Sequence, residues 1–138
     1  MASVGAIRAA IGDRLRTVNG LNVYDVWQGN ILGPCAIVVP QVSAMGQTMG
    51  RVDFSRFELD IVVAMHTAGG LPNAQQIIDG LTSNTGADSV LAALDTDRTL
   101  GGLGNLIPLG WSSPASEPIN SPNDEWLTQR LTVEVWAN

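Results

Sequence analysis

The chain has 138 residues, 13 of them acidic and seven basic, which gives a net charge of −6. This length predicts a single domain spanning residues 1–138, and the acidic balance argues against binding to a phosphate backbone. The longest apolar runs are far shorter than the roughly 20 residues of a membrane span, and the N-terminus has no signal-peptide core. We therefore expect a soluble protein, made in a reducing cytosol.

The N-terminal segment predicts an amphipathic helix that begins after Ser3 and ends at Asn19-Gly20. Its apolar residues recur at spacings of three and four, which places them on one stripe of a helix. They are Val4, Ile7, Ile11, Leu15 and Val18. The polar side carries four charged residues, Arg8, Asp13, Arg14 and Arg16, and we interpret it as a solvated face.

Three strands are predicted next, in LNVYDVW, PCAIVVP and RFELDIVVAMH, because β-branched or aromatic residues dominate them. The single cysteine, Cys35, lies in the second run, so no intramolecular disulfide can form and a small buried thiol is expected. The third run alternates over its first half, which predicts one wet face. Val62 and Ala64 predict that its second half is covered on both sides.

Residues 41–54, QVSAMGQTMGRVDF, have no helical or strand period and predict a long loop between two strands. Met45 and Met49 lie beside glycines, where flexible thioethers can adapt to a partner's surface. Together with Arg51 they are candidate interface residues. The alternatives are that these methionines pack locally, or that the loop is disordered.

The rest of the chain predicts two short helices and two further strands. The first helix lies in GGLPNAQQIIDGL, and the second, SVLAAL, would be capped by Asp88. NLIPLGW predicts another short strand, which Pro108 would either confine to an edge or break. The proline-rich residues 112–125 predict an extended connection with little structure. The fold class is therefore α+β: a single domain with a mixed, mainly antiparallel sheet of about four to five strands, and an N-terminal helix and one or two further helices packed on it.

The final strand, EWLTQRLTVEVWAN, has apolar residues on one face from Leu127 to Val135, with Gln129 as the exception. Its other face carries Trp126, Arg130 and Trp136, which are further candidate interface residues because tryptophan and arginine are enriched at interface centres. At about 3.3 Å per residue the two tryptophans stand roughly 33 Å apart, at opposite ends of the strand. The alternative is that both pack beneath flanking helices.

No catalytic, cofactor-binding or metal-binding residue is predicted, and we expect no enzymatic activity. His66 follows a strand and is interpreted as a surface or capping residue. Asp95-Thr96-Asp97 resembles the start of a calcium loop, but the glycine and glutamate that such a loop requires do not follow. We interpret it as a turn or a helix end.

The order of these elements resembles the tail terminator proteins of long-tailed bacteriophages, a family of tail-completion and head-to-tail joining proteins. The likeness runs from AIRAAIGDRLRTVNGLNVYDVWQGNILGPCAIVVP through RFELDIVVAM and LPNAQQIIDGL to EWLTQRLTVEVW. It is a likeness of element order, without a sharp motif. The resemblance implies a subunit that forms a ring with copies of itself, expected to be a hexamer, which caps the tail tube, stops its growth and joins the head connector.

The resemblance also implies a structural role without cofactors, in the virion at the tail–neck junction, after assembly in the host cytoplasm. The implied partners are the tail tube protein and the head connector or neck protein, with DNA passing through the lumen without specific binding and no membrane involved. Deleting residues 43–51 is then expected to leave the fold intact and to impair docking.

Two groups of alternatives remain. Within the same class, the chain is another neck component, such as a head-completion or adaptor protein, or a tail tube subunit. In another class, it is a small-molecule-binding domain or an unrecognised enzyme, whose polar groups would be His66, Asp60 and Glu58. Replacing His66 with alanine would then abolish ligand binding, whereas ring formation would survive.

Overall fold

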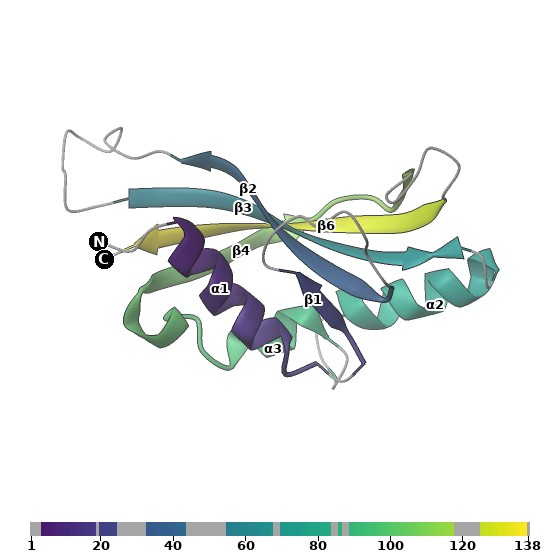
Figure 1. Ribbon diagram of the computed structural model, residues 1–138, viewed down its shortest axis with the longest axis horizontal. Helices are drawn as coiled ribbons and strands as arrows, with labels where there is room; N and C mark the ends of the chain where they lie inside the picture. Colours follow the sequence, from purple (N-terminus) through teal and green to yellow (C-terminus); the bar gives the residue numbers. More distant parts are fainter. Residues whose placement is uncertain are drawn as a thin grey trace.

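The structure, a computed structural model, describes residues 4–18, 20–24, 33–43, 55–67, 70–83, 86, 89–117 and 125–137. These residues form an α+β domain with three α-helices, a short 3₁₀ helix and one mixed sheet of six strands (Figure 1). In chain order they are α1 (Val4–Leu15), β1 (Asn22–Tyr24), β2 (Cys35–Ser43), β3 (Ser55–His66), α2 (Leu71–Thr82), α3 (Val90–Asp95), η2 (Leu100–Gly102), β4 (Gly104–Trp111), β5 (Ala115–Glu117) and β6 (Trp126–Ala137). The predicted fold class is confirmed.

The sheet has the strand order β1-β2-β3-β6-β4, and β5 pairs with β6 beyond the end of β4. β1 is parallel to β2, and the other pairs are antiparallel. The two central strands, β3 and β6, pair along their whole length, from Ser55 opposite Ala137 to His66 opposite Trp126. β1 and β4 therefore lie at opposite edges of the sheet.

All three α-helices cover the same face of the sheet (Figure 1), and the main hydrophobic core lies between them and the strands. The predicted stripe of α1 is confirmed, because Ile7, Ile11 and Leu15 are fully buried in this core. From β3 the core receives Leu59, Ile61 and their alternate neighbours. The opposite face carries no helix among the described residues. None of the described helices is long and apolar enough to cross a membrane.

Both short helices begin close to their predicted starts. Pro72 lies in the first turn of α2, where its missing amide hydrogen removes no helical hydrogen bond. The predicted cap of α3 was wrong by one residue. The hydroxyl of Ser89 accepts a hydrogen bond from the amide of Ala92 (3.1 Å), which is the geometry of an N-cap. Asp88 lies outside the described residues.

Two segments predicted as irregular contain strands. β2 continues through Pro40 to Ser43, which pairs with Phe57, and a shift in register after Pro40 accommodates the proline. Ala115–Glu117 forms β5 inside the predicted proline-rich connection. A loop deletion that spares the sheet should therefore begin at residue 44 instead of 43. The remainder of the predicted loop, with Met45, Met49 and Arg51, lies outside the described residues.

Candidate functional site

The helix-free face of the sheet is divided into an apolar half and a polar half. The apolar half forms a second small core at the end of the sheet where β6 begins. Its buried members are Cys35, Ile37, Val62, Ala64 and Trp126, with Tyr24 and Val39 packed against them. This burial confirms that the second half of β3 is covered on both faces.

Trp126 belongs to this second core and is only 2% exposed. The His66 ring meets it edge-on, with ring centroids 5.1 Å apart and an interplanar angle of 89°. Gly33 also lies against the indole, since a Cβ atom at Gly33 would come within 2.8 Å of its ring. The Trp126 side chain, predicted to contribute to an assembly interface, therefore exposes almost no surface to a partner. It packs within its own chain, on the face opposite the helices instead of beneath them.

The polar half is organised around the buried carboxylate of Asp60, which is 4% exposed although it lies on the predicted wet face of β3. Thr132 donates a hydrogen bond to it from the neighbouring strand (3.0 Å). Arg130 lies 3.8 Å from its other oxygen and is 40% exposed. The hydrogen bond from Thr132 and the nearby Arg130 cation together stabilise the buried Asp60 carboxylate, because a buried charge needs hydrogen bonds and an opposite charge.

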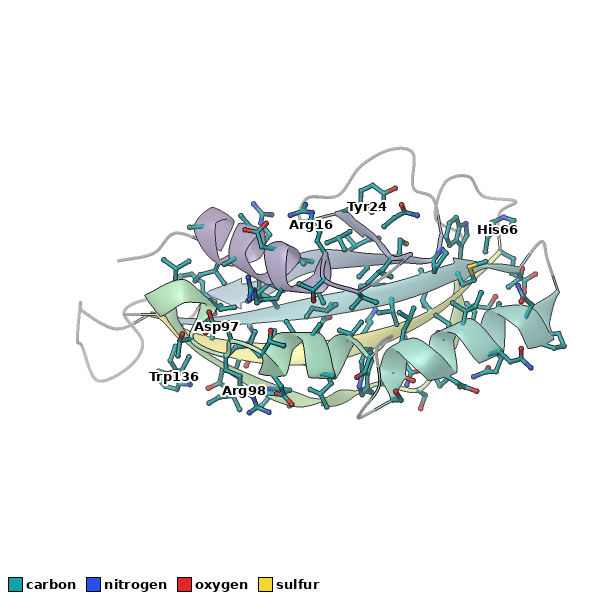
Figure 2. All side chains as sticks on the ribbon, turned by 90° about the horizontal axis from the view of Figure 1, so that it is seen from below. Arg16, Tyr24, His66, Asp97, Arg98 and Trp136 are labelled. Atoms are coloured by element: carbon teal, nitrogen blue, oxygen red, sulfur yellow. The ribbon has the colours of Figure 1, made fainter. Side chains whose placement is uncertain are left out.

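Arg130 and Trp136, the other two interface candidates of β6, lie on this polar half and are partly exposed. They lie six positions apart, or about 20 Å along a strand, so they do not contact one another. The indole nitrogen of Trp136 donates a hydrogen bond to the Glu134 carboxylate. Figure 2 shows Trp136 at the β4 side of the molecule, far from His66. The two tryptophans thus have different roles, one in a core and one on the surface.

Ile107 and Leu109 on β4 are the exposed large hydrophobic residues of the described part of the chain, at 44% and 54% exposure. We call this pair the β4 ridge. Register places Ile107 beside Glu134, which in turn lies opposite Glu58, so the ridge borders the acidic part of the helix-free face. The sequence analysis missed the ridge. The signal was the apolar run Leu106–Leu109 in a segment that Pro108 was expected either to confine to an edge or to break.

Cys35 has no environment that would make it a nucleophile. It is fully buried, and this burial raises the pKa of its thiol to about 12, although a hydrogen bond with the Ala64 backbone acts in the opposite direction. The thiolate is the reactive form of cysteine, so the native side chain should be inert. The predicted small buried thiol is confirmed.

We therefore expect Cys35 of the folded chain to resist a thiol reagent at pH 8 and to react fully once guanidinium unfolds the chain. Because the thiol titrates near 8.5 in an unfolded chain, its contribution to stability is complete below that pH and falls as pH rises toward about 12. Thiol labelling at several pH values, followed by mass spectrometry, measures how fast Cys35 reacts in the folded and in the unfolded chain. Rapid labelling at pH 8 without unfolding would contradict the buried placement.

Asp97 forms a turn and not a calcium site. Its carboxylate accepts hydrogen bonds from the amide and hydroxyl of Thr99 (3.1 and 2.5 Å) and from the amide of Gly101 (2.9 Å). These bonds, that of the Thr99 side chain first, lower the pKa of Asp97. Its oxygens thus close the turn between α3 and η2, as the interpretation of a turn or helix end predicted. Within the described ranges, no group of three or more His, Cys, Asp or Glu residues could hold a metal ion.

The residues proposed for a ligand site do not converge. Glu58 and Asp60 lie on the polar half, whereas His66 lies six residues beyond Asp60, against Trp126. A pocket of about 350 Å³ lies elsewhere, between the start of β2 and α2, and we call it the α2 pocket. It is lined by Gly20, Leu21, Pro34, Gln76, Ile77, Gly80 and Leu81. Small-molecule sites usually add a few convergent polar groups to an apolar lining, and among the described lining residues Gln76 alone has a polar side chain.

No protein-family model matches the chain, and no curated protein matches its sequence.

Proposed function

We propose that the chain is a structural subunit that assembles with copies of itself into a ring, as a tail terminator of a long-tailed phage does. The observation that carries the assembly part is the β4 ridge. Two neighbouring branched aliphatic side chains on a sheet edge gain free energy when a partner covers them, and such exposed pairs mark interaction surfaces. The resemblance in element order supports the specific role at the end of a tail tube.

The described surfaces also favour assembly over ligand chemistry. The cysteine is buried and protonated, the histidine packs on a tryptophan, and the described residues that line the α2 pocket include no acid, base or nucleophile. By contrast, the partly exposed Arg130 and Trp136 are residue types enriched where proteins meet. The polar half of the helix-free face, with Glu58, Arg130 and Glu134 partly exposed, offers polar and charged groups to a neighbouring subunit.

The test mixes the purified chain with growing tail tubes and measures tube length and the mass of the bound cap. A terminator stops elongation and leaves one ring at the tube end, whereas a tube subunit lengthens the tube and a head-completion protein leaves its length unchanged. His66→Ala serves as the matched variant, since the assembly proposal requires it to cap tubes like the parent chain. Capping lost in a folded His66→Ala chain would favour a ligand-dependent function instead.

A further inference from the structure

We infer that both edges of the sheet are closed to strand addition by prolines that face outward from its edge strands. Neither a second copy of the chain nor an extended segment of another protein can then lengthen the sheet, and contacts with a partner use side chains instead. The inference concerns the backbone of the folded chain and is independent of the proposed ring. It follows from strand register, backbone hydrogen bonds and the positions of the prolines.

β4 is the edge strand on one side of the sheet, and Pro108 lies where its backbone faces outward (Figure 1). The amide of Leu106 points away from β6, because it donates a hydrogen bond to the carbonyl of Arg98 (2.8 Å). Backbone groups of a strand alternate between its two sides, so position 108 faces outward as well. Pro108 has no amide hydrogen, and a shift in register follows before Gly110. An incoming strand thus finds no free amide at position 106 or 108.

Without its proline, the β4 edge would attract another strand. Ile107 and Leu109, which flank Pro108, are 44% and 54% exposed, and apolar residues on an exposed edge promote pairing with a further strand. Beyond β4 the same edge continues as β5, which has only three residues and follows the exposed Pro114. Short strands and prolines are both features by which sheet edges avoid such pairing.

The opposite edge of the sheet has the same arrangement at Pro40. β1 has three residues and covers β2 only from Cys35 to Ile37. From Val38 to Ser43, no described strand pairs with the outer side of β2. The amide of Asn22 donates to the carbonyl of Pro34 (3.0 Å), so the backbone of every second residue from Pro34 onward faces this outer side. Pro40 belongs to that set, and a shift in register follows it too.

The two edges therefore share one device, an outward-facing proline with a register shift within two residues after it. A proline whose nitrogen faced a neighbouring strand would remove a hydrogen bond of the sheet, whereas an outward-facing proline removes only a donor that points away from the sheet. Pro40 and Pro108 thus cost the pairing within the described sheet no hydrogen bond. They remove what an added strand would need.

Replacing these prolines with valine restores the missing amides and tests the inference. Pro40→Val and Pro108→Val are made singly and together, and sedimentation velocity compares the mass of each variant with that of the parent chain. We expect the double variant to grow beyond the parent species into fibres, with at least about tenfold more thioflavin T fluorescence. Each single variant should grow less, because only one of its edges is open.

Two readouts show whether the backbone edge makes the new contact. The amide introduced at position 108 should exchange freely with deuterium in dilute Pro108→Val and become protected once the chains associate, since it then donates to an added strand. Cys35 should stay unreactive toward a thiol reagent in the associated material, because folded chains keep it buried. The matched control is Pro72→Ala, which replaces an exposed proline at the start of α2, outside the sheet, and should keep the mass of the parent chain.

Variants that keep the unfolding midpoint of the parent chain and a protected Cys35, yet retain the parent mass up to their solubility limit, would overturn the inference. Associated chains in which the amide at position 108 still exchanges freely, or in which Cys35 reacts, would also overturn it, since they indicate contact through side chains or unfolded chains. If Pro108→Val does not fold, Pro108→Ala supplies the same amide with a smaller side chain. A parent chain that fails to cap tail tubes would remove the proposed function and leave this inference standing.

Discussion

Replacing Trp126 with alanine is expected to lower the free energy of unfolding by about 3–5 kcal/mol, the usual cost of deleting a buried large aromatic side chain. The indole fills the centre of the second core, between Gly33 and the His66 ring. Its removal leaves a cavity that the rigid central strands cannot close. Guanidinium unfolding followed by far-UV circular dichroism measures the change.

Two matched variants show whether this cost comes from burial. Trp126→Phe should lose only about 1–2 kcal/mol, because most of the ring area stays buried and the indole nitrogen has no hydrogen-bond partner among the described residues. Trp136→Ala should lose less than about 1.5 kcal/mol, since that side chain is partly exposed. Equal losses for Trp126→Ala and Trp136→Ala would contradict the division of the helix-free face into two halves.

Replacing Arg130 with methionine is expected to destabilise the chain by about 1–3 kcal/mol. The change keeps most of the aliphatic stem but removes the cation that lies 3.8 Å from the buried Asp60 carboxylate. The cost should fall short of that for a fully buried pair because Arg130 is 40% exposed and solvent screens the interaction. Chemical unfolding at pH 7 and moderate salt provides the measurement.

A double-mutant cycle separates the ion pair from the packing of the arginine stem. Asp60→Asn combined with Arg130→Met should recover much of the stability lost in Arg130→Met alone, because the neutral amide no longer needs a cation and can still accept the Thr132 hydrogen bond. A double variant that is as unstable as the sum of the two single changes would show that the pair is not coupled.

The fold was largely predictable because each major element has a clear period. The three- and four-residue spacing of Ile7, Ile11 and Leu15 defines the buried stripe of α1, and the alternation from Phe57 to Met65 defines the core face of β3. The ends of strands were less predictable where a proline, which usually ends a strand, lies in a segment that still pairs with its neighbouring strand. Pro40 suggested the end of a strand, yet a shift in register lets β2 continue to Ser43.

The candidate surfaces were predictable only in part, because alternation assigns a residue to a face but does not say what covers that face. Trp126 and Trp136 share one face of β6, and only the three-dimensional structure shows that one is in a core and the other is partly exposed. The β4 ridge depends on edge position, which Pro108 in NLIPLGW only suggested and which the strand order of the sheet determines. The buried Asp60 likewise depends on Thr132 and Arg130, which are distant in sequence.

Native mass spectrometry combined with negative-stain imaging, on the free chain and on tail tubes capped with it, tests the central claim most directly. The account predicts a closed ring of one fixed subunit number, formed either free or at the tube end, and expects six subunits. A chain that remains strictly monomeric at the highest concentration it tolerates, and that also leaves tube ends bare, would contradict it.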